Sequence, residues 1–139
     1  MKLDLATAKD LREITEVWYT CFPEPFIRQM FPYTPAVIQW WVQTNGFDMA
    51  NKPYIKFLVV RDVSPEGKRK IVGYAKWWVP IEESSFTVEE RFPKWSADSD
   101  VALCELFFGQ LAKERNELMG DKQYYCGSFQ TSWDTRRSF

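Results

Sequence analysis

The sequence contains no histidine, which removes the commonest general base from its chemistry. Neither a Ser-His-Asp nor a Cys-His arrangement can form without an imidazole. The three cysteines, Cys21, Cys104 and Cys126, lie far apart and show no Cys-x-x-Cys spacing. No zinc or other metal site is therefore predicted. Chemistry must come from backbone groups, carboxylates, tyrosines or thiols.

Carboxylates supply the candidate general bases for an amine. Glu105 lies on a predicted long helix, and Glu82 and Glu83 follow a predicted hairpin. A solvated surface position is the more frequent role of such carboxylates. No residue is therefore assigned as catalytic.

Adjacent aromatic residues on predicted strands offer further groups. Tyr124 and Tyr125 are candidates for an acid, and Trp77 and Trp78 are candidates for lining an acceptor cleft. Because neighbouring strand residues point to opposite faces, one member of each pair is expected to pack inward. Cys126 has no identifiable basic neighbour to lower its pKa, which favours a small buried residue over a nucleophile.

Composition limits the classes of partner. The 139 residues carry 18 basic and 19 acidic side chains, a net charge of −1, and fit a single domain over 1–139. Nucleic acid is not a predicted partner, since binders usually show a basic excess. No apolar run is long enough to span a membrane, and charges interrupt the amino terminus where a signal peptide is apolar. The odd cysteine count indicates reduced thiols, in the cytoplasm or the nucleus.

The first half of the chain predicts a strand and two helices. A strand is expected over 3–6, followed by a helix that is capped by Thr7 and Asp10 and runs to about residue 20. Thr34-Pro35 starts a second helix that ends near Asn45-Gly46. The segment 22–33, rich in proline and aromatic residues, is expected to be irregular.

The second half predicts a hairpin, a long helix and a last strand. Strands over 55–60 and 71–79 are joined by a turn at 64–67. The acidic segment 80–99 is either a binding loop or a mobile loop. A helix capped by Asp98 and Asp100 then runs to Gly120, and a strand follows over 123–131. The expected inner face of that helix consists of Leu103, Leu106, Phe107, Leu111 and Leu118. This order of elements predicts a layered α+β fold.

Two segments and their order resemble the GNAT family of N-acetyltransferases over most of the chain. The run from Leu5 to Leu11, LATAKDL, is similar to the family's opening, and the run from Ile71 to Trp77, IVGYAKW, is similar to its second hairpin strand. The strand ending at Thr131 is similar to its central strand. The resemblance implies a layered α/β/α fold with a mixed, mainly antiparallel sheet, truncated after the central strand.

The same resemblance implies a site for acetyl-CoA as cosubstrate and a primary amine, small or peptidic, as acceptor. The family's central strand leads into a loop with the pattern Q/R-x-x-G-x-G/A. Here Arg136 takes the Q/R position and the first glycine position falls on Phe139, so weak or absent activity is expected. The implied cofactor-binding residues are Phe129, Gln130, Thr131, Arg136 and Arg137. An ordinary terminal strand and a solvated basic tail are the alternative interpretations.

A different class of function stays open. A central strand without its later neighbours exposes an edge that can pair with another chain. The alternative hypothesis is therefore a non-catalytic interaction module that forms a homodimer through this edge. A chain without a settled function is the third alternative.

Overall fold

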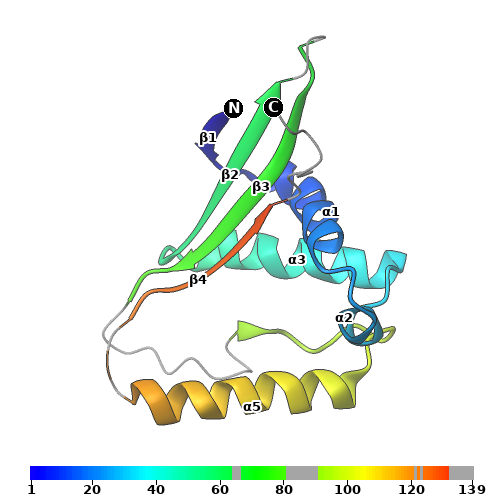
Figure 1. The fold of residues 1–139 in the computed structure, drawn as a ribbon, viewed down its shortest axis with the longest axis vertical. Coiled ribbons are helices and arrows are strands. Elements are labelled where there is room, and N and C mark those ends of the chain that lie inside the picture. The colour runs from blue at the N-terminus through cyan, green and yellow to red at the C-terminus, as the bar shows by residue number, and fades with distance from the viewer. Residues whose placement is uncertain (64–66, 81–90, 121, 123, 132–139) are drawn as a thin grey trace.

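The computed structural model describes residues 1–63, 67–80, 91–120, 122 and 124–131, and they form an α+β fold (Figure 1). Four strands build one sheet, and helices precede and follow the central hairpin. The elements in chain order are β1 (Lys2–Leu5), the 3-10 helix η1 (Ala8–Asp10), α1 (Leu11–Cys21), α2 (Pro25–Met30), α3 (Pro35–Asn51), β2 (Ile55–Val63), β3 (Arg69–Trp78), α5 (Val101–Met119) and β4 (Cys126–Thr131).

The sheet has the order β1-β2-β3-β4, and every described pair of strands is antiparallel. β2 and β3 form the long hairpin that the sequence predicts. β4 pairs with β3, with Phe129 opposite Ala75 and Thr131 opposite Gly73. Within the described residues no strand pairs with the other edge of β4. The predicted α+β class, the mainly antiparallel sheet and the final strand are confirmed.

Helices α1 and α3 cover one face of the sheet. Ile14 and Val17 of α1 pack against Val59 and Ile71, which are fully buried. Alternate residues of each strand share a face, so the residues between these core positions lie on the opposite face. That face keeps Leu3 and other apolar residues exposed.

α3 is longer than the sequence predicts, because it continues through Gly46 to Asn51. A Cβ atom at Gly46 would lie 3.2 Å from Cδ1 of Leu11 on α1. The glycine therefore allows α1 and α3 to approach closely, and it does not end the helix. The segment predicted to be irregular also contains the short helix α2, with Pro25 in its first turn.

The helices meet in an aromatic cluster formed by Trp18, Phe31, Trp40, Trp41, Phe92, Trp95 and Phe108. Phe31 is 1% exposed, and its ring stacks on that of Trp40 with centroids 5.9 Å apart. α5 joins this cluster through Cys104 and Phe108, and it lies beyond the end of the sheet at the foot of the view (Figure 1).

The predicted inner face of α5 is wrong for three of its five residues, since Leu106, Leu111 and Leu118 are exposed. Cys104 is the only α5 residue that is buried outright, and Leu103, Phe107 and Phe108 are half-buried against the aromatic cluster. The helical period marks apolar residues correctly, but among the described residues the aromatic cluster covers mainly the first turns of α5.

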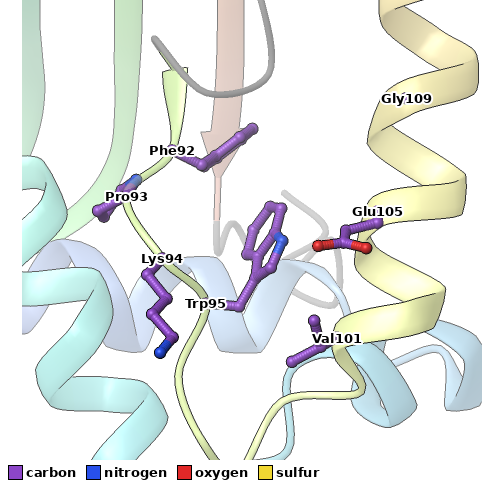
Figure 2. Close-up of a pocket in the computed structure, with 7 residues that line it drawn as sticks. All are labelled: Phe92, Pro93, Lys94, Trp95, Val101, Glu105 and Gly109. Carbon is purple, nitrogen blue, oxygen red and sulfur yellow. The ribbon is translucent and has the colours of Figure 1, made fainter.

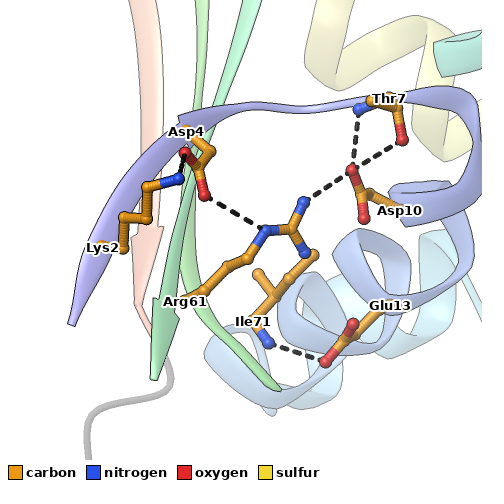
Figure 3. A network of polar contacts seen from close by, with 7 residues as sticks. All are labelled: Lys2, Asp4, Thr7, Asp10, Glu13, Arg61 and Ile71. Atoms are coloured by element: carbon orange, nitrogen blue, oxygen red, sulfur yellow. Dashed lines mark hydrogen bonds and ion pairs between the residues drawn. The ribbon is translucent and has the colours of Figure 1, made fainter. Parts of the chain in front are cut away.

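A polar network ties the amino-terminal segment to the hairpin (Figure 3). Asp10 accepts hydrogen bonds from Arg61 Nη2 at 2.8 Å and from the Thr7 backbone N–H at 2.7 Å, which confirms the predicted role of Thr7 and Asp10 at the helix start. Glu13 accepts a bond of 2.7 Å from the Ile71 N–H. Burial alone would raise the pKa of Asp10, but the bonds from Arg61 and Thr7 outweigh it and hold that pKa below 3.8.

The substitution Asp10→Asn should lower the free energy of unfolding at neutral pH by about 1–3 kcal/mol, because it removes charge-assisted hydrogen bonds. Since the folded-state pKa is depressed, the carboxylate stabilises the fold above its ordinary pKa of 3.8, and this contribution is lost as the pH falls below that value. Urea unfolding at several pH values measures both effects. The matched control is Asp62→Asn, at an exposed carboxylate. Equal losses for the two variants would contradict the prediction.

Candidate functional site

A cavity of about 700 Å³ lies between the segment 92–95 and α5 (Figure 2). It is lined by Phe92, Pro93, Lys94, Trp95, Val101, Glu105 and Gly109. We call it the α5 cavity. Its size is typical of sites for small organic ligands.

Glu105 and Trp95 give the α5 cavity its chemical character. Figure 2 shows the Glu105 carboxylate and the Trp95 indole pointing toward one another, while Lys94 extends away from α5. A carboxylate beside an indole ring suits a cation, because the ring face attracts positive charge and the oxygens accept hydrogen bonds. The structure thus places the candidate base Glu105 in the lining of a cavity that can bind an ammonium group.

A second cavity, of about 510 Å³, lies between α3 and the same segment of chain. We call it the α3 cavity. Its lining consists of Trp40, Gln43, Thr44, Phe47, Asp48, Lys52, Arg91, Phe92, Pro93 and Lys94. Phe92, Pro93 and Lys94 line both cavities. The backbone of this shared wall is held to α3 by the Trp40 indole N–H, which donates to the Lys94 carbonyl at 2.8 Å.

A buried ion pair lies at the base of the α3 cavity. Lys76 Nζ on β3 donates to Asp48 Oδ2 at 2.6 Å and to Asn45 Oδ1 at 3.0 Å, and both partners are on α3. The Asp48 side chain is 2% exposed and also binds Lys52 Nζ at 2.7 Å through its other oxygen. Burial lowers the pKa of Lys76, and the charge of Asp48 opposes that shift.

Sequence reasoning missed Lys76, Asp48 and Arg91. One signal could have found the first of them. Tyr74, Lys76 and Trp78 alternate along β3 and share the face that the helices cover, so a charged residue at this phase of the strand needs a buried partner. Nothing in the sequence pattern of α3 points to Asp48 as that partner.

The predicted cofactor-binding residues lie on β4 as far as the structure describes them. Phe129, Gln130 and Thr131 occupy consecutive positions of this edge strand. The Gln130 side chain is buried, and its Oε1 has no hydrogen-bond partner within the described part of the chain. The Thr131 hydroxyl donates to the Val72 carbonyl at 3.2 Å, and the Thr131 carbonyl accepts a bond from the Cys21 thiol at 3.1 Å. Arg136 and Arg137 lie outside the described residues.

The other candidate residues are dispersed. Trp78 is buried and Trp77 is exposed, as strand alternation predicts. A Cβ atom at Gly127 would lie 2.6 Å from the Trp77 ring, so the glycine allows the indole to lie across β4. Tyr125 is exposed. Glu82 and Glu83 lie outside the described residues.

The described part of the chain contains neither a candidate metal site nor a candidate membrane-spanning helix. Among the described residues, no group of three histidine, cysteine, aspartate or glutamate side chains could hold a metal ion. Within the same residues, no helix combines the length and the apolar character that crossing a bilayer requires.

Comparisons with known proteins give one weak likeness. No protein-family model matches the sequence, and no curated protein matches it. A solved structure described as histone acetyltransferase HPA2 and related acetyltransferase from Corynebacterium glutamicum aligns with 87% of this chain and 72% of its own, at 19% identity and a TM-score of 0.39. A likeness at this level establishes neither the family nor the function.

The buried ion pair should show strong coupling in a double-mutant cycle. Asp48→Leu should lower the free energy of unfolding by about 3–5 kcal/mol, because it leaves Lys76 without a carboxylate in a buried position. The double variant Asp48→Leu/Lys76→Met should lose much less than the sum of the two single losses. Urea unfolding of the four proteins measures the coupling.

The matched control for this cycle is the exposed pair of Lys113 and Glu117, whose atoms are 3.9 Å apart. The same cycle on that pair should give a coupling near zero. Additive losses at Asp48 and Lys76 would show that the two charges do not stabilise one another.

Proposed function

We propose that the chain is a GNAT-like N-acyltransferase domain that transfers an acetyl group from acetyl-CoA to a primary amine with weak turnover. The observation that supports this best is the position of Cys126–Thr131, which forms a strand against β3 as the resemblance requires. A helical conformation, or a place outside the sheet, would have removed the proposal. A single such domain over 1–139 stays a prediction.

The acetyl donor would lie along the open edge of β4. One row of backbone groups on an edge strand points away from the sheet, and N–H groups of this kind stabilise the oxyanion that forms at a thioester carbonyl. Phe129, Gln130 and Thr131 are the positions proposed for this contact. Arg136 and Arg137 are proposed for the phosphates.

The acceptor amine would occupy the α5 cavity beside Glu105 and Trp95. Glu105 takes a proton from the ammonium group, and the neutral nitrogen attacks the thioester carbonyl. The new C–N bond forms, the C–S bond breaks, and the CoA thiolate leaves and takes up the second proton that the nitrogen releases. Glu105 is exposed at its helix position, so water can carry its proton away.

Weak turnover follows from the phosphate end of the cosubstrate. The one Gly-x-Gly or Gly-x-Ala segment of the sequence is Gly73-Tyr74-Ala75, which lies inside β3 and is paired with β2 and β4 rather than at a helix start. Diphosphate binding in such folds depends on the close backbone approach that glycine permits, together with free N–H groups at a helix start. We therefore expect the diphosphate of acetyl-CoA to contribute little to binding by this chain.

Isothermal titration calorimetry with the 139-residue chain tests the donor half of the proposal. Acetyl-CoA should bind with a dissociation constant weaker than about 100 μM. S-acetylpantetheine, which lacks the nucleotide and the diphosphate, should bind within a few-fold of that value. A micromolar constant for acetyl-CoA with much weaker binding of S-acetylpantetheine would show that a diphosphate site exists. No binding of either compound would remove the proposed function.

A second function, a non-catalytic interaction module, is favoured by the uncovered face of the sheet. Leu3, Leu5 and Trp77 are exposed there, and a hollow of about 260 Å³ between Leu3 and Trp77 has an almost wholly apolar lining. Apolar patches of this kind mark interaction sites on soluble proteins. We propose a second copy of the chain as the occupant, because this face continues to the open edge of β4, where strands of two copies can pair.

Size-exclusion chromatography with light scattering tests this second function. The chain should form a dimer at a concentration of about 100 μM, and Trp77→Lys should shift the equilibrium to the monomer because it places a charge in the apolar interface. The control is Leu118→Lys, at a residue of α5 that is 79% exposed. A wild-type chain that stays monomeric at every concentration would contradict the dimer.

A further inference from the structure

The α3 cavity contains more positive than negative charge among its described lining. Lys52, Arg91 and Lys94 are cations, and Asp48 is the one carboxylate of that set. Asp48 already accepts bonds from Lys52 at 2.7 Å and from Lys76 at 2.6 Å. The negative charge of Asp48 is therefore engaged, and it does not balance the remaining cations.

Arg91 is the cation of this lining whose buried charge an anion would stabilise most. Its guanidinium lies 5.0 Å from the ring centroid of Trp78 and 5.7 Å from that of Phe92. Asp48 is the described carboxylate whose charge acts on Arg91, and both oxygens of Asp48 already bind lysines. Burial lowers the pKa of Arg91, which means that its surroundings disfavour the charged form. An arginine stays protonated at neutral pH all the same, so a bound anion would offset the cost of burying this charge.

A second polar group faces the same space. Thr44 lines the cavity and is 4% exposed, and its Oγ1 has no hydrogen-bond partner within the described residues. A buried hydroxyl without a partner costs free energy. An oxygen atom of a bound ligand would accept a hydrogen bond from this hydroxyl.

The apolar walls of the α3 cavity define the rest of the ligand. The rings of Trp40 and Phe92 lie nearly parallel, at an interplanar angle of 21° with centroids 6.4 Å apart. Phe47 supplies a further aromatic surface. A volume of about 510 Å³ is within the range of small-molecule sites. The cavity therefore combines flat apolar walls with a cationic end.

We propose that the α3 cavity binds a small organic anion, in which a carboxylate or phosphate group is attached to an aromatic body. The anionic group is held by Arg91 and Lys94 and accepts a hydrogen bond from Thr44. The aromatic body lies against Trp40 and Phe92. Arginine suits either anion, because its planar fork forms paired hydrogen bonds with two oxygens. This inference is independent of acetyl transfer.

Four probes that share one aromatic ring test the proposal on the full chain. Phenylacetate and phenyl phosphate carry the anion, phenylacetamide is the neutral isostere, and phenethylamine carries the opposite charge. Nuclear magnetic resonance titration follows the Trp40 indole N–H, which bonds to the Lys94 carbonyl. The two anions should shift this signal and saturate, and they should bind roughly tenfold or more tightly than the amide. The tighter anion identifies the preferred group.

Three variants test the assigned contacts. Arg91→Gln and Lys94→Gln should each weaken phenyl phosphate roughly tenfold and leave phenylacetamide unchanged, and Thr44→Val should weaken both anions by a smaller factor. The control Lys56→Gln, at an exposed lysine outside the cavity, should bind as the wild type does. Lys94 is exposed, so the Lys94→Gln variant should fold. It therefore tests the proposal even where Arg91→Gln does not fold.

Three results would overturn the proposal. The first is equal affinity for phenylacetate and phenylacetamide, which would leave the ring alone as the source of binding. The second is unchanged affinity for phenyl phosphate in a folded Lys94→Gln variant. The third is no shift of the Trp40 signal with either anion at about 10 mM, a concentration that detects even millimolar binding.

Discussion

The buried ion pair between Lys76 on β3 and Asp48 on α3 is the constraint on which the arrangement of the helices depends. An ammonium group inside a sheet–helix interface is tolerated only with a close carboxylate and further hydrogen bonds. α3 supplies both, through Asp48 and Asn45. These residues lie on either side of Gly46, where the absence of a side chain lets α1 pack closely. The helix must therefore pass through its glycine, and this sets the position of α3 on the sheet.

The position of α3 determines where the cavities lie. Trp40 of α3 is buried, and its indole N–H donates to the Lys94 carbonyl and so fixes the segment between the two cavities. On the far side of that segment, α5 packs on the aromatic cluster through residues of its first turns, while Leu111 and Leu118 farther along are exposed. The segment 92–94 thus separates the α5 cavity, which is lined by the carboxylate of Glu105, from the α3 cavity, which is lined mainly by cations. The α3 cavity could not form if α3 ended at Gly46, because Phe47 and Asp48, which line it, belong to the last turns of the helix.

Local patterns predicted the elements whose causes are local. The hairpin, the helix start at Thr7 and Asp10, and the strand ending at Thr131 follow from β-branched runs, turn residues and a capping group, and the structure confirms them. The end of α3 and the inner face of α5 depend on neighbours distant in sequence. The hydrophobic periodicity of these helices therefore does not predict them correctly. The same division holds for the site. Glu105 was identified by residue type on a helix, whereas Arg91 became a candidate only when folding placed it beside Trp78 and Phe92.

Burial decides which of the two cavities can discriminate ligands by charge. Two unit charges 4 Å apart attract by about 1 kcal/mol in water and by about 4 kcal/mol at the effective dielectric constant near a protein surface. Glu105 is on an exposed helix position, so water screens its attraction for a cation. Arg91 is half-buried against the rings of Trp78 and Phe92, so water screens its attraction for an anion less. Selection by charge is therefore stronger in the α3 cavity. In the α5 cavity, an amine would be selected mainly by shape and by its contact with Trp95.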